Sequence, residues 1–131
     1  MGKVSVLIAD TKSVLGIVAL SDVIRPEAKS VIEELSKLKI ESVMLNGDNE
    51  KTAQYFSTLA GIKKVFSKLL PEEKVLEIET LRKNGKTVCM LGDGVNDAPA
   101  LKTANLGIAM GTMGSDIAVE AADIALMTDD I

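Results

Sequence analysis

The chain has 131 residues, of which 47% are hydrophobic and only 2% aromatic, and its formal net charge is -4. This length fits one domain whose core is built from aliphatic side chains. The 15 Lys and Arg residues form no basic cluster, which argues against nucleic acid as a partner, and with no His and one Cys any metal site must use oxygen ligands.

The first predicted elements are a hairpin and a helix. Two apolar runs, residues 3–8 and 14–20, flank the polar residues 10–13 and predict a β-hairpin. Pro26 suits the first turn of a helix, and apolar residues recur at helical spacing over residues 28–38. We therefore expect an amphipathic helix after the hairpin.

The rest of the chain alternates short apolar runs with helical patterns. Such alternation predicts a doubly wound α/β fold with a mostly parallel sheet. Cys89 is expected to be a buried residue of its strand. The predicted strands are residues 42–45, 64–66, 87–91, 106–110 and 124–127, and the predicted helices are residues 50–60, 71–83, 96–103 and 115–122.

No predicted element is suited to a membrane. The longest uncharged stretch, residues 103–115, contains three glycines and is shorter than the roughly 20 apolar residues that a span needs. No signal-peptide pattern opens the sequence. We expect a cytoplasmic segment that does not itself insert into a membrane.

Two polar loops follow predicted strands and suggest a binding site. In α/β sheets, ligands bind beyond the carboxyl ends of the strands. Asn46-Gly47-Asp48 and Gly92-Asp93-Gly94-Val95-Asn96-Asp97 both combine glycine with carboxylates suited to a hard cation. Together they predict a pocket for phosphate and Mg²⁺, although Asn-Gly-Asp alone is typical of a turn and Lys74 alone is typical of a solvated helix residue.

Four motifs resemble one protein family. The ten residues 92–101 resemble the signature of P-type ATPases, which are members of the haloacid dehalogenase superfamily. Residues 44–49 resemble the family's Thr-Gly-Asp motif, residues 70–74 resemble the segment with its essential lysine, and residues 21–28 are similar to its hinge. The resemblance covers nearly the whole chain, most firmly from Met44 onward.

The last part of the chain resembles the heavy-metal branch of that family. Residues 107–111 and 115–127 are similar to this branch, and Asp129-Asp130 is most like the zinc, cadmium and lead exporters, with copper transporters close behind. The resemblance implies a three-layer, mostly parallel, Rossmann-like sheet of the haloacid dehalogenase type with an N-terminal β-hairpin. It also implies one partial phosphorylation domain over residues 1–131, in which residues 1–25 are the tail of the nucleotide-binding region and the hinge, and residues 26–131 are the core.

The resemblance implies a mechanism in which an aspartate accepts the γ-phosphoryl group of ATP and loses it to water, coupled to cation movement across a membrane. Mg²⁺ is the implied cofactor and ATP the implied substrate. Asp93 would hold Mg²⁺, with Asp97 as the second candidate metal ligand. Lys74 would place its charge on a phosphoryl oxygen, and Asp97 would hold that ammonium in place.

Five further residues have roles implied by the same motifs. Asn96 would donate its amide N–H to the phosphoryl group. Asn46 and the backbone N–H of Gly47 would donate to the same group. Asp22 and Arg25 would act at the hinge, near the nucleotide.

The sequence departs from the family pattern in two places. Asn46 stands where the family has Thr or Ser, although its NH₂ group can still donate. The Asp-Lys-Thr-Gly-Thr motif with the phosphorylated aspartate is absent, and only Asp10-Thr11-Lys12-Ser13 imitates it, in the wrong order. We expect the chain to need its missing partners, which are the nucleophile strand, the nucleotide-binding domain and the membrane helices of the ATPase, or to pair with a second copy.

Two other interpretations remain open at this point. In the first, the chain is a small soluble phosphatase of the same superfamily, with Asp10 as its nucleophile. A non-enzymatic interpretation is a regulatory module that pairs with a complete transporter.

Overall fold

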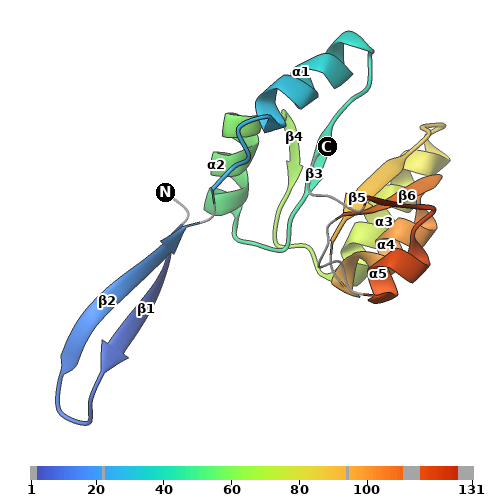
Figure 1. Cartoon of the computed structure of the whole chain (residues 1–131). Coiled ribbons are helices and arrows are strands. Elements are labelled where there is room, and N and C mark those ends of the chain that lie inside the picture. Colours follow the sequence, from blue (N-terminus) through green and yellow to red (C-terminus); the bar gives the residue numbers. More distant parts are fainter. Residues whose placement is uncertain (1–2, 22, 94, 111–115, 127–131) are drawn as a thin grey trace. The chain divides into compact units, whose positions relative to one another are not determined.

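The chain folds into two compact units, residues 1–68 and 69–131. The computed structural model describes residues 3–21, 23–93, 95–110 and 116–126. Both units combine helices with strands, and Figure 1 follows them in chain order from blue to red. The predicted α/β class, the parallel pairing of the later strands and the N-terminal hairpin are confirmed.

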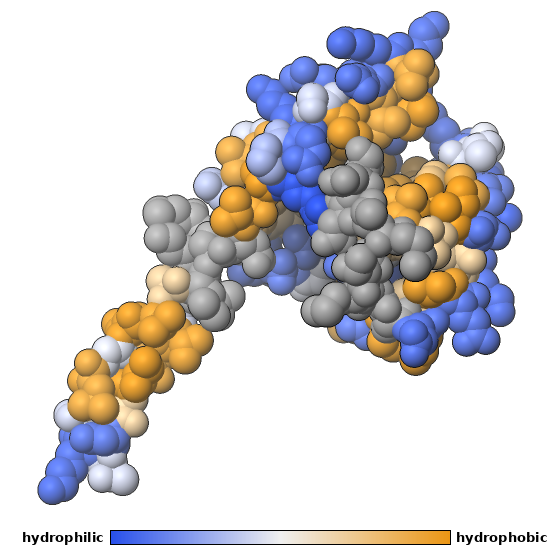
Figure 2. All heavy atoms as spheres, in the orientation of Figure 1, coloured by the Kyte–Doolittle hydropathy of each residue, from blue (hydrophilic) through white to orange (hydrophobic). Residues whose placement is uncertain are grey.

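The hairpin consists of β1 (Lys3–Ala9) and β2 (Val14–Ser21), which pair antiparallel. Seven of its large apolar side chains are between 44% and 66% exposed, and Figure 2 shows orange spheres gathered on the hairpin. A two-stranded hairpin by itself is marginally stable in water. These exposed side chains are Val6, Leu7, Ile8, Val14, Leu15, Ile17 and Val18.

The rest of the first unit is built around a pair of parallel strands. Helix α2 starts where the Asn49 side chain accepts a hydrogen bond from the Thr52 N–H, 3.0 Å, and ends at Gly61, whose φ of 80° suits glycine. It buries Ala53 and Ser57 on one face. The elements are α1 (Ala28–Lys37), β3 (Val43–Leu45), α2 (Glu50–Ala60) and β4 (Lys64–Phe66), with β3 parallel to β4.

The second unit contains a three-stranded parallel sheet in the order β5-β6-β7. One buried cluster in this unit consists of Leu101, Ala109 and Ala118, each at most 1% exposed, with Met90 and Ala122 packed against them. The elements are α3 (Pro71–Lys83), β5 (Cys89–Gly92), the 3₁₀ turn η1 (Val95–Asp97), α4 (Ala98–Thr103), β6 (Leu106–Met110), α5 (Asp116–Ala121) and β7 (Ile124–Leu126).

The prediction for the strand around Cys89 was wrong in two respects. Strand β5 begins at Cys89 and not at Thr87, because the Val88 N–H donates to the Asn105 side chain, 3.0 Å, and not to a neighbouring strand. Cys89 is exposed and not buried, because its neighbour Met90 is the one that packs against the core, and because β5 lies at one end of the three-stranded sheet in the described part of the second unit. Partial desolvation still raises the pKa of the Cys89 thiol.

Within the described residues, no helix has the length and apolar character needed to cross a bilayer.

The predicted boundary between the hinge region, residues 1–25, and the core, residues 26–131, stays a prediction.

Candidate functional site

Helix α3 places Lys74 in its first turn. The helix begins at Pro71, where a missing N–H costs nothing, and the Leu70 N–H donates to the Glu73 carboxylate, 2.7 Å. Lys74 precedes Ile78 by four residues, and Ile78 is 1% exposed. The two therefore share one helix face, which carries Lys74 toward the interior of the unit.

Lys74 forms an ion pair with Asp97. Its Nζ lies 2.8 Å from Asp97 Oδ1, and each side chain is only 14% exposed. A charge-assisted hydrogen bond this short, largely shielded from water, is much stronger than a surface pair. Because Asp97 ends η1 and Lys74 lies in the first turn of α3, the pair fixes the loop after β5 against α3. The ammonium has two more protons with which to bind an anion.

The loop after β5 also presents Asp93 and Asn96. Both side chains are exposed, Asp93 directly after the strand and Asn96 within η1. Between them, Gly94 lies outside the described residues. Exposed carboxylate and amide groups at the carboxyl end of a parallel strand are accessible to a ligand.

This donor set fits Mg²⁺, which binds through one or two carboxylates and completes its octahedron with water and phosphate oxygens. In the described part of the chain no three His, Cys, Asp or Glu side chains cluster as a ready-made metal cage. Asp93 is exposed and suited to such a single-carboxylate contact. Asp97 is the poorer ligand, because Lys74 already binds one of its oxygens.

The loop after β3 has a defined conformation. Asn46 Oδ1 accepts a hydrogen bond from the Asp48 N–H, 2.8 Å, and the Asn46 N–H donates to Phe66 O, 2.9 Å. The Asp48 carbonyl accepts from the Lys68 N–H, 2.9 Å. Since its carbonyl oxygen closes this turn, the Asn46 carboxamide would meet a ligand through its NH₂ group. Gly47 is exposed at the tip.

The predicted site residues divide between the two units. Lys74, Asp93, Asn96 and Asp97 belong to the second unit, and the structure brings Lys74 and Asp97 into contact. Asn46 and Gly47 belong to the first unit, together with the predicted hinge residues. Arg25 is exposed and its carbonyl accepts from the Ala28 N–H, 3.1 Å, whereas Asp22 lies outside the described residues.

Asp10 closes the hairpin turn. Its Oδ1 accepts hydrogen bonds from the N–H groups of Lys12 and Ser13, each 2.7 Å, and its own N–H donates to Ser13 O, 3.0 Å. The hydrogen bonds from Lys12 and then Ser13 lower the pKa of Asp10 below its ordinary value of 3.8. Hydrogen bonds of this kind, from N–H groups two and three residues further along, are typical of an Asp that caps a turn.

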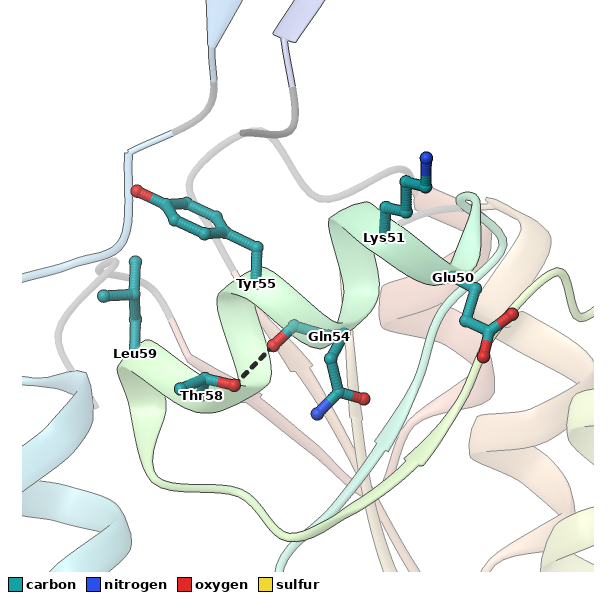
Figure 3. Close-up of a pocket in the computed structure, with 6 residues that line it drawn as sticks. All are labelled: Glu50, Lys51, Gln54, Tyr55, Thr58 and Leu59. Atoms are coloured by element: carbon teal, nitrogen blue, oxygen red, sulfur yellow. Dashed lines mark hydrogen bonds between the residues drawn. The ribbon is translucent and has the colours of Figure 1, made fainter.

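A hollow on the surface of α2 does not coincide with the predicted site. Figure 3 shows its lining, in which Thr58 Oγ1 donates to Gln54 O within the same helix, 2.7 Å. Tyr55 and Leu59 are each 41% exposed. All six lining residues come from α2, namely Glu50, Lys51, Gln54, Tyr55, Thr58 and Leu59, and none has a predicted chemical role.

Sequence reasoning missed two interactions that hold α4 and the sheet in place. Arg82 Nη1, near the end of α3, donates to Thr103 O at the end of α4, 2.6 Å. The Asp123 carboxylate accepts from the Gly107 N–H, 2.8 Å, and the Asp123 N–H donates to Gly107 O, 2.9 Å. Neither pair has a local sequence signal, because the partners are 21 and 16 residues apart.

Comparison with known proteins places this site in context. Residues 2–105 match the family model of the haloacid dehalogenase-like hydrolases. The chain is 48% identical over 130 residues to a zinc-transporting ATPase of Bacillus subtilis and 48% identical over 130 residues to a copper-exporting P-type ATPase of Staphylococcus aureus. These matches cover 99% of the chain but 20% and 16% of the two relatives.

A solved structure agrees with these matches. The crystal structure of a zinc-transporting PIB-type ATPase in the E2.Pi state has a TM-score of 0.81 and 42% sequence identity to the chain. The match covers 95% of the chain and 20% of that protein. The chain therefore spans a fifth or less of the length of each of these three proteins.

Proposed function

The chain belongs to the haloacid dehalogenase-like hydrolases, and from this membership we propose that it is the Mg²⁺- and phosphate-binding part of the phosphorylation domain of a heavy-metal P-type ATPase. The observation that carries the proposal is the largely buried ion pair between Lys74 and Asp97, together with the exposed Asp93 in the same loop as Asp97. Relatives named for zinc and for copper match at the same 48% identity, so the proposal covers heavy metals as a class.

The proposed chemistry is phosphoryl transfer, which depends mainly on positioning and on neutralising charge. Asp93 would hold Mg²⁺, which neutralises charge on the phosphoryl oxygens when bound. Lys74 binds an equatorial oxygen of the phosphoryl group, and Asp97 fixes the direction of its ammonium. Asn96 would be a further donor in this unit, and the donor roles of Asn46 and the Gly47 N–H stay predictions.

The remainder of the ATPase would supply what this segment lacks. The large apolar side chains of the hairpin are up to 66% exposed, at Ile17. So many exposed apolar side chains on one element are unusual on the surface of a complete soluble domain. They support a larger sheet in the complete protein, as does the small share of each relative that the chain spans. We assign the nucleotide-binding region, the nucleophile strand and the membrane helices to those other parts.

The proposal assigns the nucleophilic aspartate to another part of the protein, so the isolated chain should not become phosphorylated. We expect its intact mass to stay unchanged after incubation with Mg²⁺ and either ATP or acetyl phosphate, because Asp10 is engaged by the turn amides. The measurement is intact-protein mass spectrometry. A gain of one phosphoryl group that disappears in Asp10→Asn would contradict this assignment and favour a soluble phosphatase.

A chimeric transporter tests the proposed function directly. The 131 residues replace the matching stretch of the Bacillus subtilis zinc-transporting ATPase, which is 48% identical over 130 residues. We expect the chimera to form a phosphoenzyme from ATP and Mg²⁺ at a rate within about tenfold of the parent, since the loops that carry the chemistry are kept. The parent is the control. A chimera that inserts and folds but forms no phosphoenzyme would overturn the proposal.

A further inference from the structure

Gly92, the last residue of β5, lies against the side chain of Asp97. A Cβ atom placed at Gly92 would be 2.7 Å from Asp97 Cβ, 3.0 Å from its Cγ and 3.1 Å from its Oδ2. Carbon atoms do not approach to 2.7 Å without displacement, because their contact optimum is about 3.5–4.0 Å. The three nearest heavy atoms all belong to Asp97, so the space that glycine leaves is filled by that one side chain.

Backbone conformation does not explain this glycine. Gly61 and Gly85 have φ values of 80° and 77°, in the left-handed region that favours glycine, but Gly92 does not. Gly16 also lies outside the left-handed region, but a Cβ atom placed there would meet no heavy atom within 4 Å. The reason for glycine at position 92 is therefore steric.

In the sequence, Gly92 was singled out only as part of a loop that combines glycine with carboxylates suited to a cation. The structure assigns Gly92 a different role: we propose that it is a positioning residue whose missing side chain lets Asp97 reach Lys74. Asp97 Oδ2 lies over Gly92, and Asp97 Oδ1 binds Lys74 Nζ at 2.8 Å. One carboxylate is thus held between a glycine and an ammonium.

A methyl group at position 92 would move the base of the Asp97 side chain and not only its end. Because Cβ is attached to the backbone, it cannot swing aside as a terminal atom can, and η1 or the start of α4 must shift with it. The carboxylate then leaves its position opposite Lys74. A displacement of about 1 Å in a positioning contact can slow a reaction by about a hundredfold. That rate effect rests on the proposed function, whereas the contact itself does not.

The test observes the ion pair in the complete 131-residue chain. In ¹⁵N-lysine-labelled protein, the Lys74 ammonium should give a signal whose protons are protected from exchange with water, identified by its loss in Lys74→Arg. We expect this signal in the unaltered chain and in Gly16→Ala, which adds the same methyl group in open space. Gly92→Ala should lose it while the backbone amide spectrum stays dispersed. A protected signal in folded Gly92→Ala would overturn the proposal, as would its absence from the unaltered chain.

A second comparison covers the case in which Gly92→Ala strongly destabilises the fold. Asp97→Gly removes all three atoms that the new methyl group would meet. In that background, Gly92→Ala should leave the midpoint of urea unfolding unchanged, although it lowers the midpoint when Asp97 is present. An equal loss in both backgrounds would show that the glycine serves something other than Asp97.

The chimeric transporter separates this proposal from the proposed function. Gly92→Ala should slow phosphoenzyme formation by about a hundredfold, and Gly16→Ala should not. If the chimera is active and Gly92→Ala keeps the full rate, the positioning role is wrong and the proposed function stands. If the unaltered chimera is inactive but Gly92→Ala loses the protected Lys74 signal, the proposed function is wrong and the positioning role stands.

Discussion

Replacing Asp93 with asparagine in the chimeric transporter is expected to lower Mg²⁺-dependent phosphoenzyme formation by about a thousandfold and to leave the fold unchanged. Asparagine keeps the shape of the side chain but removes the charge that attracts a hard cation. Asp93 is exposed, so no buried contact is lost. Asp97, the other candidate metal ligand, is a poor replacement for Asp93 because it is bound to Lys74 at 2.8 Å.

The measurement is incorporation of labelled phosphate from ATP over a range of Mg²⁺ concentrations. We expect the half-saturating Mg²⁺ concentration to rise steeply in Asp93→Asn. Asp123→Asn is the matched control, since it removes the same charge from the same unit, and an amide oxygen can still accept the hydrogen bond from the Gly107 N–H. An unchanged Mg²⁺ dependence in Asp93→Asn would refute the proposed role of Asp93.

Local sequence signals predicted the helices well. The bounds of α2 and α3 match the prediction to the residue, because a capping Asn49 and a first-turn Pro71 mark their starts and Gly61 closes α2. The hairpin turn at Asp10 was predictable for the same reason, since its hydrogen bonds join residues only two or three apart.

Interactions between distant residues were not predictable in this way. Strand β5 starts late because the Asn105 side chain, 17 residues away, takes the N–H of Val88. Lys74 looks like a solvated helix residue until its partner Asp97, 23 residues away, is known. The resemblance to a family singled Lys74 out and named Asp97 as its partner, but the 2.8 Å distance and the burial that make the pair strong come from the fold.

Replacing Lys74 with methionine is the second change with a large expected effect. In the 131-residue chain it leaves the Asp97 carboxylate, 14% exposed, without a counter-charge, and should lower the free energy of unfolding by about 3 kcal/mol. In the chimera it should slow phosphoenzyme formation by about a thousandfold, because the charge on the phosphoryl oxygen is also lost. Urea unfolding and labelled-phosphate incorporation measure the two effects.

The same helix offers a matched control. Lys83 pairs with Glu79 at 3.4 Å, but the two side chains are 77% and 43% exposed. Solvent screens such a pair, so Lys83→Met should change the free energy of unfolding by less than about 1 kcal/mol and leave the phosphorylation rate unchanged. A similar loss in both variants would mean that α3 merely tolerates methionine poorly.

A double variant separates the structural effect of the pair from its chemical effect. Replacing both partners, as Lys74→Met with Asp97→Leu, removes the unpaired buried charge and should restore the free energy of unfolding to within about 1 kcal/mol of the unaltered chain. The phosphorylation rate should stay as low as in Lys74→Met, because methionine and leucine supply neither the ammonium that binds a phosphoryl oxygen nor the carboxylate that positions it. If the double variant regains both stability and rate, Lys74 serves only the fold. If it regains stability alone, the charged pair of Lys74 and Asp97 serves the phosphoryl transfer and not only the fold.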